Sequence, residues 1–236
     1  MRSSYDIKTA IILAGGEGLR LRPLTSDTPK AMISVAGKPL LQWIIEWLTR
    51  NGIQDLIIGV AYQKEKIMEY FDNGNRFNVG IRYSVHTVEG GTSQGFRQAI
   101  QRYVDDDYFL AMNGDELVDL SLASFAAFHR SNGGTVTIAV GPLRSPYGVV
   151  ELQGANVVGF VEKPILHSHH VSVGTYIFSH DILGYLPEKG DVERTTFPHL
   201  ASLGKLKAYV HTGFWATVNT MKDLEDLENQ LKPRSV

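Results

Sequence analysis

Strand-like and helix-like segments alternate along residues 1–141, and this alternation limits the fold more than any other feature of the sequence. Residues 9–16 (TAIILAGG) form a short apolar run closed by glycines, as expected of a fully buried strand. Residues 37–52 instead carry apolar side chains at helical spacing. Similar pairs continue up to a strand at residues 135–141. Because such alternation is typical of a parallel sheet covered by helices on both faces, we predict an α/β fold.

The sequence after residue 141 has a different character. Three strand-like runs with short connections, YGVVEL, VVGFVEKP and VSVGTYIFS, indicate an antiparallel or mixed section around a pocket. No linker, repeat or low-complexity tract separates the two halves. We therefore predict a single domain, residues 1–236, with one lobe over about 8–141 and a second over about 142–236.

Composition excludes several classes of function. The chain has a net charge of −2, and no basic stripe marks a surface for nucleic acid. It has no cysteine, which excludes disulfides and thiolate metal sites. The N-terminal apolar run is too short for a signal peptide, and no stretch reaches the ~18–20 apolar residues of a membrane helix. These features predict a soluble, cytoplasmic protein that binds neither nucleic acid nor membrane.

The loop after the first strand, LAGGEGLRLRPLTSDTPKAM, combines glycines with basic residues. Backbone N–H groups of a glycine-rich turn can approach a phosphate closely. Two common phosphate motifs do not fit, because Arg20 and Leu21 replace the second glycine and the lysine of a P-loop, and the dinucleotide fingerprint lacks its third glycine. Pro23 and Pro29 keep the segment from continuing as a helix, so Lys30 is expected to return toward Arg20.

Such a loop suits a triphosphate that is attacked at phosphorus. Negative charge grows on the phosphoryl oxygens and on the departing pyrophosphate, and the cations of Arg20 and Lys30 would stabilise it. Judged by its glycines alone, the loop is equally compatible with a tight turn that carries solvated surface cations.

The longer stretch LAGGEGLRLRPLTSDTPKAMISVAGKPLLQW resembles the signature of the sugar-1-phosphate nucleotidyltransferases, G-x-G-x-R-L-x-P-L-T followed by P-K and G-K-P. The resemblance implies a Rossmann-like, mostly parallel mixed sheet flanked by helices, of the nucleotide-diphospho-sugar transferase type. It also implies that Arg20 and Lys30 are catalytic and hold the nucleotide phosphates. The nucleotide-binding positions that it implies in the loop are Leu13, Ala14, Gly15, Gly16 and Gly18.

Two further segments of the first lobe resemble the same family. GGTSQG (residues 90–95) is similar to the segment that contacts the base, which implies nucleotide binding by Gly91 and Thr92. YFLAMNGDE is similar to the strand that ends in a Mg²⁺-binding aspartate, here Asp115. The first lobe is therefore expected to bind the nucleotide.

The second lobe resembles the sugar-phosphate-binding part of the family. YGVVEL and VVGFVEKP are similar to its sugar-site segments. They imply a backbone contact at Gly148, hydroxyl contacts from Glu162, and a catalytic contact between Lys163 and the sugar phosphate.

One position departs from the family pattern. After a tryptophan near the C-terminus, relatives carry a second Mg²⁺-binding aspartate, and in FWATVNTMKDL this position is Thr217 in one register and Asn219 in the other. Asp223 is expected to point away. Asp115, the triphosphate and a weak neutral ligand from Asn219 would then hold Mg²⁺, with Mn²⁺ as the alternative ion. The histidines of LHSHH (residues 166–170) are interpreted as a polar loop rather than a metal site.

The resemblance implies an enzyme that makes an NDP-sugar and pyrophosphate from an NTP and a sugar 1-phosphate. GGTSQG and the stretch TTFPHLASLGKLKAYVHTGFW favour GTP with mannose or heptose 1-phosphate. One alternative is a thymidylyl-, uridylyl- or cytidylyltransferase acting on glucose 1-phosphate. Another is a non-catalytic nucleotide- or sugar-binding regulatory protein of the same fold. The chain is expected to stop before the C-terminal β-helix that some relatives carry, and whether it forms a homo-oligomer is left open.

Overall fold

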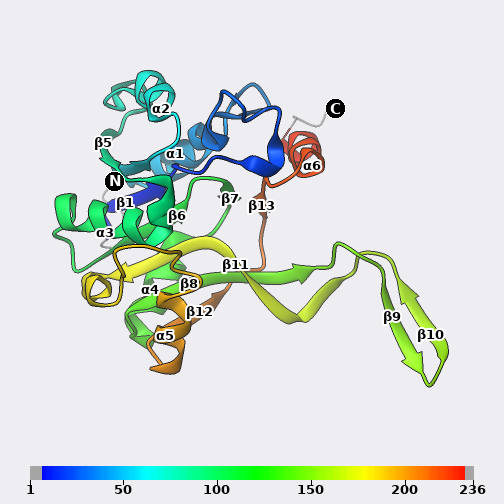
Figure 1. Cartoon of the computed structure of the whole chain (residues 1–236). Coiled ribbons are helices and arrows are strands. Elements are labelled where there is room, and N and C mark those ends of the chain that lie inside the picture. Colours follow the sequence, from blue (N-terminus) through cyan, green and yellow to red (C-terminus); the bar gives the residue numbers. More distant parts are fainter. Residues whose placement is uncertain (1–6, 232–236) are drawn as a thin grey trace.

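One seven-stranded sheet forms the centre of the computed structural model, which describes residues 7–231 (Figure 1). Residues 1–6 and 232–236 of the predicted domain lie outside the described residues. In spatial order the strands of the sheet are β12 (Leu206–Val210), β8 (Val136–Arg144), β11 (Ile165–Ser179), β6 (Tyr108–Asn113), β1 (Thr9–Leu13), β4 (Asp55–Val60) and β5 (Gly80–Val85). The α-helices are α1 (Leu40–Arg50), α2 (Lys64–Phe71), α3 (Gly91–Tyr103), α4 (Leu122–Asn132), α5 (Thr196–Ser202) and α6 (Met221–Leu231).

The sheet is mixed and mostly parallel, which confirms the predicted fold class. β1 pairs in parallel with β4 and β6, as do β4 with β5 and β8 with β12. Only β11 runs antiparallel to its neighbours, β6 and β8. The predicted boundary between the lobes, near residue 141, falls inside β8, so a single sheet contains strands from both halves of the sequence.

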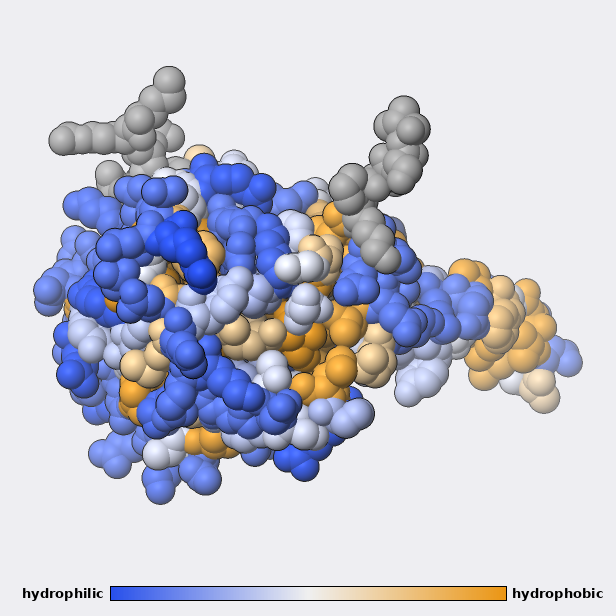
Figure 2. Space-filling model, turned by 90° about the horizontal axis from the view of Figure 1, so that it is seen from above, coloured by the Kyte–Doolittle hydropathy of each residue, from blue (hydrophilic) through white to orange (hydrophobic). Residues whose placement is uncertain are grey.

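A hairpin arm, which we define as residues 145–164, leaves the sheet where β8 and β11 end their pairing. It contains β9 (Val149–Gln153) and β10 (Asn156–Val161), which form a separate two-stranded antiparallel sheet. The arm projects far from the body of the molecule (Figure 1), and hydrophobic side chains gather on its outer end (Figure 2).

The histidine-rich segment at residues 166–170 is not the polar loop that the sequence predicted. It is part of β11, and the pairing of β11 with β8 shifts register between Leu166 and His170. The extra residues form an irregular stretch of strand, which keeps their polar side chains exposed without interrupting the strand.

Alternate residues of β1 enter the two hydrophobic cores on opposite faces of the sheet. Ala10 and Ile12 face the core that contains side chains of α1, α2, α4 and α6, whereas Ile11 faces the core that contains side chains of α3 and α5. This follows from the period of two in a strand, and it explains why a strand covered on both faces is apolar throughout. Within residues 7–231, no helix combines the length and the apolar character that crossing a bilayer requires.

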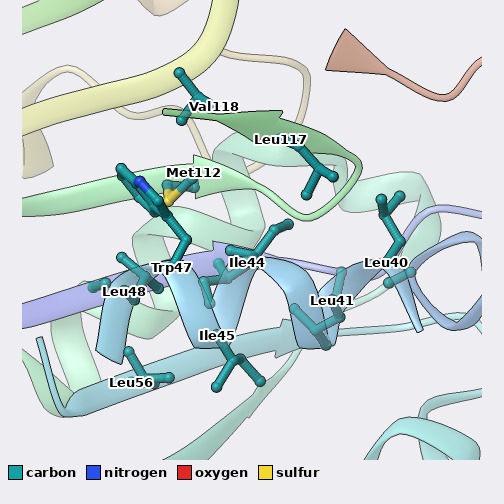
Figure 3. Close-up of a cluster of buried hydrophobic side chains, with 14 of the residues drawn as sticks. Leu40, Leu41, Ile44, Ile45, Trp47, Leu48, Leu56, Met112, Leu117 and Val118 are labelled. Carbon is teal, nitrogen blue, oxygen red and sulfur yellow. The ribbon is translucent and has the colours of Figure 1, made fainter. Parts of the chain in front are cut away.

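Helix α1 shows how the periodic pattern becomes packing. Its apolar positions fall on one side of the helix and are buried, including Leu41 and Ile44 at 0% and 1% exposure. Figure 3 shows this side facing Met112 of β6 and the short strand β7 (Glu116–Val118). Burying one such side chain contributes about 1.5–3 kcal/mol. The packing holds β6 and β7, and therefore the segment between them, in a fixed position.

Candidate active site

The site lies where the strand order of the sheet reverses. From β1 the chain continues through β4 and β5 on one side, and it then crosses to β6 on the other side of β1. In open α/β sheets, ligands bind beyond the carboxyl ends of the strands at such a reversal. The N–H of Gly114, after β6, donates to the carbonyl of Leu13 at 2.7 Å, which ties the two strand ends together.

A cavity of about 300 Å³ opens at these strand ends. A second cavity adjoins it and shares Gly16, Lys30 and Asp115. The predicted nucleotide and metal residues that line the first cavity are Leu13, Ala14, Gly15, Gly16, Lys30, Gly91, Thr92 and Asp115. Gly18, Arg20 and Asn219 line the second. The structure thus brings together Arg20 and Asn219, which the sequence separates by 199 positions.

The glycine-rich loop is held in a compact shape by its own side chains. Gly18 has a φ of +64°, and a Cβ there would lie 2.9 Å from the methyl group of Thr25 and 3.0 Å from Cβ of Lys30. The Thr25 hydroxyl donates to the Gly18 carbonyl at 2.8 Å. Only short 3₁₀ turns, Leu19–Leu21 and Lys30–Met32, follow the glycines within the loop, as its prolines predicted. The compact loop turns Lys30 back beside Gly18.

Cations and their acceptors converge between the loop and the C-terminal part of the chain. Lys30 forms an ion pair with Asp115, and its ammonium also donates to Oδ1 of Asn219 at 2.9 Å. Arg20 Nη2 donates to the same Oδ1 at 2.9 Å. The Lys30 side chain is 11% exposed and that of Asp115 is 29% exposed. Two cations and one carboxylate therefore face the cavities. Lys30 and Asp115 are partly buried, where charge interactions are stronger than in water, whereas Arg20 is exposed.

The two candidate positions for the second metal ligand have different roles here. Asn219 Nδ2 donates to the Thr217 hydroxyl at 3.0 Å, which directs Oδ1 of Asn219 toward the cations. Asp223 points elsewhere, as predicted, because its Oδ2 accepts the N–H groups of Asn219 and Thr220 at 3.0 and 2.8 Å. Within residues 7–231, no three histidine or acidic side chains form a metal-holding group. A divalent ion would need oxygen ligands from a substrate as well.

The N-terminus of α3 closes the other side of the first cavity. Gly91 has a φ of +65°, and a Cβ there would lie 2.5 Å from the carbonyl of Gly190. The Thr92 hydroxyl accepts the N–H of Val192 at 2.9 Å and donates to Glu193 at 3.2 Å. The segment after β11 therefore fixes the end of α3 that was predicted to contact the base.

The predicted sugar-phosphate residues do not join this cluster. Gly148, Glu162 and Lys163 all belong to the arm, and none of them lines either cavity. A Cβ at Gly148 would lie 2.5 Å from the ring of Phe160 and 3.0 Å from Glu162. Gly148, Phe160 and Glu162 therefore lie close together on the arm. Lys163 pairs with Glu162 at 3.6 Å, and both side chains are at least half exposed.

A sequence profile described as "Nucleotidyl transferase" matches residues 9–233. The chain belongs to this family. A mannose-1-phosphate guanylyltransferase catalytic subunit beta of Dictyostelium discoideum is 34% identical over 221 residues, which cover 91% of this chain and 62% of the relative. A UTP–glucose-1-phosphate uridylyltransferase of Synechocystis is 33% identical over 236 residues, which cover 91% of this chain and 61% of the relative. The chain thus spans about three fifths of the length of these curated relatives.

Two solved structures share the fold of this chain. The crystal structure of HddC from Yersinia pseudotuberculosis superposes with a TM-score of 0.77 at 26% identity, and covers 96% of this chain and 100% of that one. A putative glucose-1-phosphate thymidylyltransferase from Bacillus anthracis also gives 0.77, at 21% identity, over 97% of this chain and 96% of that one. The resemblance noted in the sequence is confirmed.

Among the residues of this nucleotidyl transferase that line the first cavity, sequence reasoning missed the titratable side chains of His86 and Asp191. His86 follows β5, and a Cβ at Gly15 would lie 2.7 Å from its Nε2. The imidazole ring therefore packs directly against Gly15 of the glycine-rich loop. Asp191 lies beside the N-terminus of α3. A polar residue directly after a predicted parallel strand was the available signal for His86. Asp191 gave no local signal.

A buried acidic residue, Glu116, adjoins the site without lining either cavity. It follows Asp115 and is buried beside Gly174 of β11. Burial, together with the neighbouring Asp115 carboxylate, raises the pKa of its carboxyl group to about 8. The raised pKa favours the protonated form of Glu116 at neutral pH, and Asp115 is the acidic residue that pairs with Lys30.

Acid should destabilise this nucleotidyl transferase through His86, which is half-buried, and His129, which is buried. Burial lowers the pKa of His86, and burial together with Arg130 lowers that of His129, whose Nδ1 lies 2.7 Å from the Thr137 hydroxyl. Since the unfolded chain keeps a histidine pKa near about 6.5, it binds more protons than the folded chain below that pH. The two histidines should therefore lower the free energy of unfolding as the pH drops below about 6.5, while Glu116, whose pKa is raised, contributes in the opposite direction.

The measurement is urea unfolding between pH 7.5 and 5.0 for the wild type, for the double variant His86→Gln/His129→Gln, and for His169→Gln, which replaces an exposed histidine. Relative to the wild type, only the double variant should gain stability as the pH falls from 7.5 to 5.0. An unchanged slope in that variant would show that other groups cause the acid sensitivity.

Proposed function

We propose that this protein is a sugar-1-phosphate nucleotidyltransferase, which makes an NDP-sugar and pyrophosphate from an NTP and a sugar 1-phosphate. The convergence of Arg20, Lys30 and Asp115 beside a glycine-rich loop carries this proposal. The phosphate oxygen of the sugar phosphate would attack the α-phosphorus of the NTP in line with the leaving pyrophosphate. Because the attacking phosphate is already an anion, no general base is needed. Positioning and charge stabilisation account for the catalysis.

The donors around the loop fit the requirements of a divalent cation. Mg²⁺ binds through one or two carboxylates together with substrate phosphates and water. Asp115 supplies the carboxylate, and Oδ1 of Asn219 supplies a neutral oxygen; both accept a hydrogen bond from the Lys30 ammonium. When bound, the ion would neutralise charge on the triphosphate. Lys30, whose ammonium pairs with Asp115, would contact the phosphates of the nucleotide.

The identities of the base and the sugar are the finer part of the proposal. We favour GTP with mannose or heptose 1-phosphate, because the similarity to mannose-1-phosphate guanylyltransferases agrees with the preference inferred from the sequence. Uridylyl- and thymidylyltransferases are also among the similar proteins, so glucose 1-phosphate with UTP or dTTP is the competing pair. We place the reaction in the cytoplasm.

A substrate matrix tests this proposal. Each NTP would be combined with glucose, mannose, heptose and glucosamine 1-phosphates, and pyrophosphate release would be measured at saturating Mg²⁺. We expect the fastest release for GTP with mannose or heptose 1-phosphate. A strong preference for UTP or dTTP would contradict the choice of base, and no release with any pair would contradict the activity.

The neutral residue at position 219 favours a second candidate function. A regulatory protein that binds a nucleotide or a sugar without turnover would not need a second metal carboxylate. Such a protein would bind NTP and release no pyrophosphate, whatever metal is supplied.

Asn219→Asp should lower the Mg²⁺ concentration required for half-maximal activity. The carboxylate would replace a carbonyl oxygen that lies 2.9 Å from both the Arg20 and the Lys30 donors. Because the number of charged ligands tunes the affinity for divalent cations over several decades, we expect a shift of about tenfold. The measurement is a Mg²⁺ and Mn²⁺ titration of pyrophosphate release.

Two further variants complete the titration. Thr217→Asp places a carboxylate at the position that the other alignment with the family pattern assigns to the second metal ligand. Asn75→Asp adds the same charge at an exposed position outside the site. Neither should match the shift of Asn219→Asp. Inactivity of the wild type and of both site variants, with NTP still bound, would favour the regulatory candidate.

A further inference from the structure

The arm of residues 145–164 presents an unusually apolar surface. Residues that pair across the two strands share a face of the hairpin, and two such pairs are Val157–Leu152 and Phe160–Val150. Both pairs lie on the same face, because Val150 and Leu152 are two residues apart in one strand. These four side chains are 44–66% exposed. A two-stranded hairpin alone is only marginally stable in water, and strands that expose apolar side chains are prone to pair with other chains. The arm therefore needs a surface to pack against.

The chain's own body does not supply that surface. β11 pairs with β8 as far as Ile165 with Arg144, and the Ser145 N–H then donates to the carbonyl of Pro164 at 3.0 Å. This ladder continues into the base of the arm and directs it away from the cavities (Figure 1). Folding the arm back onto its own cavities would require these backbone hydrogen bonds to break.

The arm also carries chemistry that the cavities lack. The cavities collect the nucleotide and metal residues, whereas the Lys163 cation and the Glu162 carboxylate lie on the arm. The proposed reaction needs a cation for the phosphate of the sugar and an acceptor for its hydroxyl groups. The cavities of one chain therefore lack the residues predicted to bind the sugar phosphate, and its arm lacks the residues predicted to bind the nucleotide.

We infer that two copies of this chain exchange their arms, so that Glu162 and Lys163 of each protomer complete the sugar-phosphate site of the other. In a two-fold dimer, the arm of each protomer packs beside the cavities of its partner. The apolar faces of the two arms are then both covered. The number of residues in the arm is similar to the about 20–30 residues that each partner contributes to a stable interface. This inference rests on the proposed function for the role of the sugar-phosphate residues, but not for the exchange itself.

A complementation experiment tests the role of the arm in the partner's site. Arg20→Ala removes a nucleotide-side cation and leaves the arm intact, whereas Lys163→Ala alters only the arm. The two chains are co-expressed with different affinity tags, and the heterodimer is purified through both tags. At limiting sugar 1-phosphate each homodimer should be nearly inactive, and the heterodimer should recover about half of the wild-type rate, because one of its two exchanged sites is intact.

Completion within one chain predicts a different result. Each site of the heterodimer would then contain one of the two substitutions, and no activity would be recovered. A silent heterodimer would overturn the inference, and so would an active wild type that sediments as a monomer at micromolar concentration.

A second measurement does not depend on activity. The chain has no cysteine, so Leu19→Cys at the rim of the second cavity and Val161→Cys on the arm introduce the only thiols. In the double variant a short bismaleimide should give a covalently linked dimer if the arms are exchanged, and a cross-linked monomer if each arm closes on its own body. Val161→Cys alone measures the background. A cross-linked monomer would overturn the inference even if the substrate matrix showed no activity.

Variants of the arm surface make the dimer itself testable. Phe160→Glu adds charge to the apolar face and should shift the sedimentation of the protein from dimer to monomer. Gln153→Glu adds the same charge on the opposite face of the hairpin and should leave the dimer intact. Circular dichroism would verify that both variants fold. A Phe160→Glu variant that folds and remains dimeric would exclude the arm as the interface.

Discussion

Replacing Arg20 by alanine should lower the rate of pyrophosphate release by about 10²–10³-fold, which is the effect of removing one preorganised donor for transition-state charge. The Arg20 guanidinium is already fixed at the cavity by its 2.9 Å hydrogen bond to Asn219. It therefore needs little reorganisation to contact a triphosphate. The measurement is steady-state pyrophosphate release at saturating NTP and sugar 1-phosphate.

Arg22→Ala is the matched control for this variant. It removes an exposed arginine from the same loop that lines neither cavity, and its activity should stay close to wild type. Nearly full activity of Arg20→Ala would reject the assignment of the loop as the phosphate site. A similar loss in both variants would instead show that the loop depends on its net charge.

Replacing Lys30 by methionine should cause a loss of the same order, about 10²–10³-fold, for a related but separate reason. The Lys30 ammonium pairs with Asp115 and donates to Asn219 while its side chain is 11% exposed. Methionine keeps the aliphatic stem that packs beside Gly18, so the loop should keep its shape while it loses the charge. Single-turnover rates and NTP affinity would separate the chemical step from binding.

The control for Lys30→Met is Lys64→Met, which removes a lysine from α2 that lines neither cavity. Its activity and its unfolding midpoint should match those of the wild type. If Lys30→Met lost activity only because it failed to fold, its unfolding midpoint would fall well below that of the control. Full activity in a folded Lys30→Met protein would contradict a catalytic role for this residue.

The sequence predicted the elements of this fold because their signals are local. The apolar run of β1 and the helical spacing in α1 are read within a single segment, and both form as expected. The prolines of the loop also act locally, and the structure has only short 3₁₀ turns after the glycines within the loop. The polar histidine segment at residues 166–170 was predicted wrongly, because polarity alone does not distinguish a loop from an exposed and irregular strand.

The sequence by itself determined the class of the fold and the members of the phosphate loop, since periodicity and short spacings act between neighbours in the chain. Only the tertiary structure decided that Asn219 meets Arg20 across 199 positions, that His86 supports Gly15, and that the arm points away from the cavities. These outcomes depend on the order of strands in the sheet and on how far the β8–β11 ladder extends. Strand order is set by the packing of the whole chain, and no local pattern encodes it.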